Sequence, residues 1–153
     1  MFKIILFKMI DVILFVVTLT FYSVTEAACD ISKVRIVYGV SEIYSHEDMD
    51  SAIAIIKEMF SKWNGCELHS IRYTDDAYCN TKENIGWMNK LAKGRGYESN
   101  FTQCIAFFSS FHSPKDDENN STTFNTDSEY EDWSWYLARR DGGKWELMTF
   151  GYC

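Results

Sequence analysis

The stretch SHEDMDSAIAIIKEMFSKW, residues 45–63, decides the fold, because it is the clearest helix in the sequence. Ser45 suits the N-cap, and Asp48 three residues later completes a capping box. Gly65 suits the left-handed conformation that ends a helix. Apolar side chains recur every three or four residues and form one continuous stripe, which a sheet packed on the helix would bury: Met49, Ala52, Ile53, Ile56, Met59, Phe60 and Trp63.

Several other segments have the patterns of strands, and one has a weaker helical pattern. The order of these elements predicts a segregated α+β domain rather than an alternating parallel α/β one. We expect a curved antiparallel sheet of about four strands wrapped on the long N-terminal helix. The polar segment at residues 113–129 is predicted to be an exposed loop, in which Phe124 contributes little to stability. The strand-like segments are residues 33–39, 66–73, 103–112, 131–139 and 144–152, and the second helix is residues 81–93.

The first 27 residues have the layout of a secretory signal peptide. Two lysines precede an apolar run at residues 12–22, which is shorter than the about 20 residues that span a bilayer. An uncleaved membrane anchor is the alternative. Cys29 follows two alanines, as in a bacterial lipoprotein site, so a lipid on Cys29 is a second alternative. We expect residues 1–27 to be removed and residues 28–153 to fold as a single α+β domain, secreted or held at the cell surface.

The acidity of the chain restricts its partners. Its 15 basic and 22 acidic residues give a net charge of −7. The leader holds two basic residues and two acidic residues, so residues 28–153 have 13 (15 − 2) against 20 (22 − 2), a charge of −7. That balance argues against nucleic acids and anionic membranes as partners. We expect an unknown protein or small-molecule ligand, no cofactor, and membrane contact only through the signal peptide or a lipid anchor.

Four cysteines are candidates for disulfide bonds in an oxidising compartment: Cys66, Cys79, Cys104 and Cys153. If the last three strands form a meander, Cys104 and Cys153 lie on opposite edges, roughly 25 Å apart at about 3.3 Å per residue. A disulfide needs Cα atoms within about 7 Å. Cys104–Cys153 is therefore excluded, and among the pairings that remain open we favour Cys66–Cys153 with Cys79–Cys104. Cys66 and His69 form a lone Cys-x-x-His without a second half, so no metal site is predicted.

The nearest set of catalytic residue types is His69, Tyr73 and Asp76, at the end of one predicted strand. His69 and Tyr73 share a strand face, so a general base beside a phenol is geometrically possible. The favoured interpretation places both at the rim of the sheet and Asp76 in a turn. The oxygen-rich residues 116–120 are interpreted as a solvated acidic loop, because they lack the spacing and glycine of a calcium-binding loop.

Apolar residues of the last two predicted strands form an aromatic ladder. Packing of this ladder against the helical stripe is the favoured interpretation. The alternative is a platform on which a carbohydrate or peptide stacks. The residues are Trp133, Trp135 and Leu137 on one strand face, and Trp145, Leu147 and Thr149 on the next.

Three patterns extend over about residues 41–152. They are Ser41-Glu42-x-Tyr44-Ser45-x-Glu47; Asn64-Gly65-Cys66-Glu67-Leu68 with Arg72-Tyr73-x-Asp75-Asp76; and Tyr130-x-Asp132-Trp133-x-Trp135-x-Leu137-x-Arg139 with Lys144-Trp145 and Gly151-Tyr152. Together they resemble a group of small secreted proteins and lipoproteins of clostridia and their relatives. The resemblance implies a nuclear transport factor 2-like or cystatin-like fold and export, but no activity. Cys79, Cys104 and Cys153 are additions to the pattern.

The leading expectation is an exported, non-enzymatic binding or interaction module of unknown ligand. The first alternative is a small cone-fold enzyme of isomerase or hydrolase type that uses His69, Tyr73 and Asp76. The second is a protein inhibitor of cystatin-like architecture, although the glycine signature of cystatins is absent. A polar dyad inside an apolar cavity would favour the enzyme over the binding module.

Overall fold

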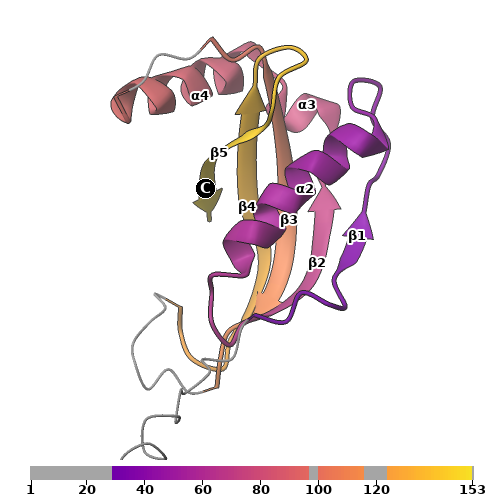
Figure 1. The fold of residues 1–153 in the computed structure, drawn as a ribbon, viewed down its shortest axis with the longest axis vertical. Coiled ribbons are helices and arrows are strands. Elements are labelled where there is room, and N and C mark those ends of the chain that lie inside the picture. Colours follow the sequence, from indigo (N-terminus) through magenta and orange to yellow (C-terminus); the bar gives the residue numbers. More distant parts are fainter. Residues whose placement is uncertain (1–28, 97–99, 116–123, 153) are drawn as a thin grey trace, which may run out of the picture.

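A computed structural model shows one five-stranded sheet with helices against both faces (Figure 1). The structure describes residues 29–96, 100–115 and 124–152. The strands lie in the sheet in the order in which they occur in the chain. In chain order the elements are β1 (Arg35–Val37), α2 (His46–Phe60), β2 (Glu67–Tyr73), α3 (Asp76–Cys79), α4 (Lys82–Gly94), β3 (Gln103–His112), β4 (Glu129–Arg139) and β5 (Glu146–Gly151).

The sheet is mixed, which corrects the expected antiparallel sheet of about four strands wrapped on one long N-terminal helix. β1 is parallel to β2, with Ile36 opposite Ile71, whereas β2 to β5 pair antiparallel. The pairing of β1 with β2 is possible because α2 supplies the long crossover that parallel neighbours need. The described helices have 15, 4 and 13 residues, and the longest one follows β1. The α+β content is confirmed, but the nuclear transport factor 2-like or cystatin-like description is wrong.

Helix α2 begins as its sequence predicts. Ser45 Oγ accepts a hydrogen bond from Asp48 N, and Asp48 Oδ2 accepts one from Ser45 N, which completes the capping box. The apolar stripe is buried against the sheet face that carries Ile71, Ile105 and Phe107. Each fully buried side chain of this size stabilises the fold by about 1.5–3 kcal/mol. The buried members of the stripe are Met49, Ala52, Ile53, Ile56 and Phe60.

The other face of the sheet has a second, smaller core. In β3, Cys104 and Ala106 alternate with Ile105 and Phe107 and belong to this second core, together with Met88 of α4. The predicted disulfide Cys79–Cys104 is confirmed, with its Cα atoms 5.5 Å apart, and it joins α3 to β3. Figure 1 shows α3 and α4 at one end of the sheet, so the opposite end of this face is left without a helix.

A charged pair joins the start of α2 to the end of β4. Arg139 Nη1 donates to Asp48 Oδ1 at 2.6 Å, and the guanidinium lies 4.2 Å from the ring centre of Trp145. Burial opposes ionisation of Asp48, but hydrogen bonds from Arg139 and Ser45 outweigh it and hold the pKa of this carboxyl below its usual range. Trp145 also donates from Nε1 to the Asp48 carbonyl at 3.0 Å. The helix is therefore held in register against the sheet by both polar and apolar contacts.

Three predictions concern residues outside those that the structure describes. They are the signal peptide at residues 1–27, the acidic residues 116–120, and the bond from Cys66 to Cys153. Within the described ranges, every helix is too short or too polar to cross a membrane.

Candidate functional site

The three residues that the sequence suggested for catalysis lie in two separate places. Tyr73 is buried, and its hydroxyl donates to Asp76 Oδ1 at 2.6 Å. Asp76 also accepts from Ser41 Oγ and from the Glu42 amide. Burial opposes ionisation of Asp76, but the bonds from Ser41 and Tyr73 keep the pKa of its carboxyl below the usual range. This network fastens the loop before α2 to the start of α3, and His69 takes no part in it.

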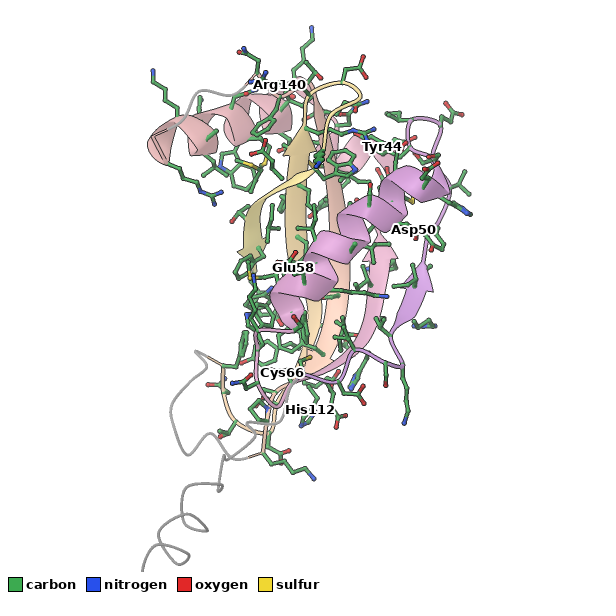
Figure 2. All side chains as sticks on the ribbon, in the orientation of Figure 1. Tyr44, Asp50, Glu58, Cys66, His112 and Arg140 are labelled. Carbon is green, nitrogen blue, oxygen red and sulfur yellow. A yellow bond between two sulfur atoms is a disulfide. The ribbon has the colours of Figure 1, made fainter. Side chains whose placement is uncertain are left out.

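His69 belongs to a chain of ion pairs at the other end of β2. Its Nδ1 lies 3.0 Å from Glu129 Oε1, and Glu129 Oε2 lies 3.1 Å from His112 Nδ1. His112 Nε2 lies 3.0 Å from Asp127 Oδ1. The hydrogen bonds from His112 to Asp127 and Glu129 raise the pKa of this imidazole. Figure 2 shows His112 at the end of the sheet, far along the fold from Tyr44. The described residues hold no cluster of His, Cys, Asp and Glu suited to a metal ion.

An aromatic cluster occupies this same end of the domain, on the α2 face of the sheet. Its inner members Phe111 and Trp135 are fully buried, and Trp63 stacks on Trp135 with ring centres 5.4 Å apart. Its outer members face solvent: Phe150 is 39% exposed and Tyr152 is 64% exposed. We define the aromatic cluster as Trp63, Phe111, Phe124, Tyr130, Trp133, Trp135, Phe150 and Tyr152.

Phe124 corrects one expectation from the sequence. The sequence predicts an exposed loop in which Phe124 contributes little to stability, but the Phe124 side chain is half-buried. Its ring centre lies 4.9 Å from that of Trp63 and 5.5 Å from that of Trp133. The pairing of β3 with β4 holds both ends of the polar segment at the sheet. Phe124 therefore lies close to the rings of Trp63 and Trp133 and packs against them.

Trp133 is the unusual member of the aromatic cluster. Trp135 donates from Nε1 to Ser109 Oγ at 2.8 Å, and Trp145 donates to the Asp48 carbonyl. The Trp133 Nε1 is buried as well, yet it has no hydrogen-bond partner among the described residues. Buried indole N–H groups nearly always find an acceptor, and an unpaired one costs about 1–3 kcal/mol. This donor is therefore a candidate for contact with a ligand.

Tyr152 packs on Trp133. The two ring centres lie 5.1 Å apart, and Tyr152 also stacks at 6.3 Å on Tyr130. Tyr152 follows the last residue of β5 and keeps most of its surface in solvent. Tyr152 is thus an exposed ring that contacts both Trp133 and Tyr130.

Next to the aromatic cluster, the sheet edge is open. The outermost recorded pair between β4 and β5 at this end is Ser134 with Gly151, so the first residues of β4, 129–133, extend beyond β5. Near its other end, β5 is covered by Arg95, whose guanidinium donates to the carbonyls of Leu147 and Met148. The structure records no strand on the outer side of β5 within the described residues.

Two shallow grooves lie elsewhere on the surface. One, of about 150 Å³, lies on the uncovered part of the sheet, where Arg72 spans Phe108 and pairs with Asp132 at 2.9 Å. The other, of about 470 Å³, lies between Ile55 of α2 and the turn before Trp145. In the first groove, the positive charge of Arg72 is already neutralised by Asp132. Neither groove contains any of the three residues suggested for catalysis.

No protein-family model, curated protein or solved structure matches this chain. The resemblance to small exported proteins of clostridia therefore stays a prediction from sequence. The arrangement of the side chains has to carry the functional argument.

Proposed function

We propose that this protein is an exported, non-enzymatic binding module whose aromatic cluster takes up an extended, positively charged segment of a partner protein. The observation that carries the proposal is the buried Trp133 Nε1, which has no hydrogen-bond partner among the described residues and whose ring contacts the solvent-exposed ring of Tyr152. An indole donor and exposed aromatic faces suit a peptide, because its carbonyl groups accept hydrogen bonds and its side chains cover the rings.

Charge favours a cationic partner. Four of the six residues 127–132 are acidic, and this segment carries Tyr130 and leads into Trp133. Arg72 pairs with Asp132, and the imidazoles of His112 and His69 contact Asp127 and Glu129, but the four carboxylates outnumber these three partners, so the segment keeps a net negative charge. Lysine or arginine side chains would be attracted to these carboxylates and would also stack on aromatic faces, a contact worth about 0.5–1 kcal/mol at an exposed site.

The open sheet edge favours an extended partner over a helical one. The first residues of β4 lie beyond β5, next to the outer rings of the aromatic cluster. An added strand would satisfy main-chain groups on this edge, while its alternate side chains would meet the rings. The acidic, strongly twisted neighbourhood of Asp132, whose φ is +52°, works against self-association through the same edge.

Isothermal titration calorimetry with defined peptides tests the proposal. The probes are an alternating Lys-Val peptide, its Glu-Val counterpart and a soluble oligosaccharide. We expect the Lys-Val peptide to bind, with an affinity that falls as salt rises, and the other two not to bind. The proposal would be overturned if the Glu-Val peptide bound more strongly than the Lys-Val peptide, or if no probe bound at all. Binding of the oligosaccharide alone would also overturn it and would assign the rings to carbohydrate stacking.

A double variant locates the binding surface. Phe150→Ser with Tyr152→Ser removes the outer rings and should weaken Lys-Val binding at least tenfold, since aromatic anchors carry most of the energy of such contacts. Val40→Ser is the matched control, because Val40 is an exposed apolar residue, 87% accessible, that lies in the loop after β1. Equal affinities of the double variant and the wild type would place binding elsewhere.

A further inference from the structure

Cys29, a candidate for lipidation, and Cys66, a candidate for a disulfide bond, lie side by side. Asp30 forms a parallel bridge with Glu67, so the preceding residues Cys29 and Cys66 are register neighbours. Two main-chain hydrogen bonds hold this register: Asp30 N to the Cys66 carbonyl at 3.0 Å, and Leu68 N to the Asp30 carbonyl at 3.1 Å. Neighbouring strands lie about 4.8 Å apart, inside the range of about 4.4–6.8 Å that Cα atoms of a disulfide adopt.

The two side chains share one environment. Cys29 is 8% exposed and Cys66 is 1% exposed, and both belong to the core on the α2 face of the sheet. Burial first, and then a negative charge on the neighbouring Cys66, raise the pKa of Cys29 to about 12. Register and burial thus point to the same pair.

The structure holds both residues in the thiol form. We propose that Cys29 and Cys66 are joined by a disulfide bond in the mature protein, as a second crosslink beside Cys79–Cys104. The oxidant is a second molecule that carries a reactive disulfide, and the same kind of oxidant can form the Cys79–Cys104 bond. One thiolate of the pair attacks the oxidant disulfide and releases one oxidant thiolate. The other thiolate then attacks the mixed disulfide and releases the second. Two cysteine thiols lose two electrons and two protons, and one oxidant disulfide becomes two thiols.

Both cysteines are buried, so an oxidant reaches their sulfur atoms most readily before the core closes. We therefore expect oxidation during folding, and slow reduction of the bond afterwards because both sulfur atoms are buried. The crosslink closes a loop that contains β1 and α2, and Cys66 N donates to the Trp63 carbonyl at 3.3 Å. It thus also fixes the turn that carries Trp63 of the aromatic cluster.

This pairing excludes two of the expectations from sequence. A sulfur atom of Cys29 held in a disulfide cannot carry a lipid, and Cys66 cannot also bond to Cys153. The proposal stands on the strand register and is independent of the peptide-binding proposal.

Peptide mapping without reduction tests it on the full chain produced by oxidative secretion. Unpaired thiols are first blocked with iodoacetamide under denaturing conditions. Tryptic cleavage after Lys33, Lys62 and Arg72 then separates the two cysteines into different peptides. We expect one linked mass that contains both peptides and is two hydrogens lighter than their sum. An alkylated or acylated Cys29, or a link from Cys66 to Cys153, would overturn the proposal.

Single variants supply the control. Cys29→Ser should make Cys66 accessible to iodoacetamide after denaturation, and Cys66→Ser should do the same for Cys29. Cys79 and Cys104 should stay protected in both variants. The thermal midpoint of either variant should fall by roughly 10 °C, as expected for opening a loop of this length. If neither variant exposes a new thiol, the two residues are not bonded to each other, whatever the stability of the variants.

Discussion

The charged pair between α2 and β4 gives the sharpest prediction about stability. Asp48→Asn keeps the size of the side chain and an oxygen that can cap α2, but it removes the charge that faces Arg139. The side chains of Arg139 and Asp48 are 11% and 28% exposed, so the pair lies between an exposed pair, worth about 0–1 kcal/mol, and a buried one, whose disruption costs about 3–5 kcal/mol. We expect a loss of about 2 kcal/mol in the free energy of unfolding.

The dependence of this loss on pH is equally specific. The pKa of Asp48 is lowered in the folded protein, so the stabilisation is present above the unfolded value of about 3.9 and disappears as the pH falls through the folded value. Urea denaturation followed by tryptophan fluorescence at several pH values measures it. The difference between wild type and Asp48→Asn should be full at pH 7 and should shrink below about pH 4.

A neighbouring carboxylate supplies the matched control. Asp50 is exposed on the same helix and accepts a hydrogen bond from Tyr38 at 2.5 Å. Asp50→Asn should change the free energy of unfolding by less than about 0.5 kcal/mol. A stabilising role of the Asp48–Arg139 pair is refuted if Asp48→Asn is as stable as Asp50→Asn. It is also refuted if the loss in the free energy of unfolding of Asp48→Asn stays the same in acid.

Two further predictions concern the end of the sheet that carries the aromatic cluster. Phe124→Ala should lower the free energy of unfolding by about 1–3 kcal/mol, because removing a fully buried ring costs about 3–5 kcal/mol and this ring is only half-buried. An unchanged urea midpoint would show that Phe124 is exposed to solvent. NMR titration of His112 should give a pKa above about 6.5, which Asp127→Asn should lower. Because folding raises the pKa of His112, its charged form stabilises the fold fully below about pH 6.5, and this stabilisation disappears as the pH rises through the pKa of the folded protein. If His112 titrates identically in the wild type and in Asp127→Asn, the contact between His112 and Asp127 is contradicted.

Local features of the fold could be predicted from sequence, and non-local ones could not. The capping box at Ser45 and the apolar stripe of α2 depend on residues within a few positions of one another, and both are confirmed. The parallel pairing of β1 with β2 depends on how α2 packs, which no local pattern encodes. The sequence excluded Cys104–Cys153 but left both Cys66 and Cys79 open as partners of Cys104, and the structure selects Cys79.

The candidate site shows the same limit. Trp133 and Trp135 share an apolar pattern and were expected to be equivalent, but Trp135 is fully buried and Trp133 is not. The difference arises because the last recorded partner of β4 at this end is Gly151, opposite Ser134, so the strand beside Trp133 ends. Cys29 was considered only for export and lipidation, because its proximity to Cys66 depends on a bridge between segments far apart in sequence.

The proposed peptide binding requires the Trp133 indole to donate a hydrogen bond to the bound peptide. Two-dimensional ¹H–¹⁵N NMR of the indole groups tests it, with the Trp133 signal assigned through Trp133→Phe and the Lys-Val peptide as the titrant. We predict that the Trp133 indole signal moves strongly as the peptide binds, whereas those of Trp135 and Trp145, which already donate to Ser109 and to the Asp48 carbonyl, stay in place. A saturating peptide titration that leaves the Trp133 signal unmoved would contradict the account.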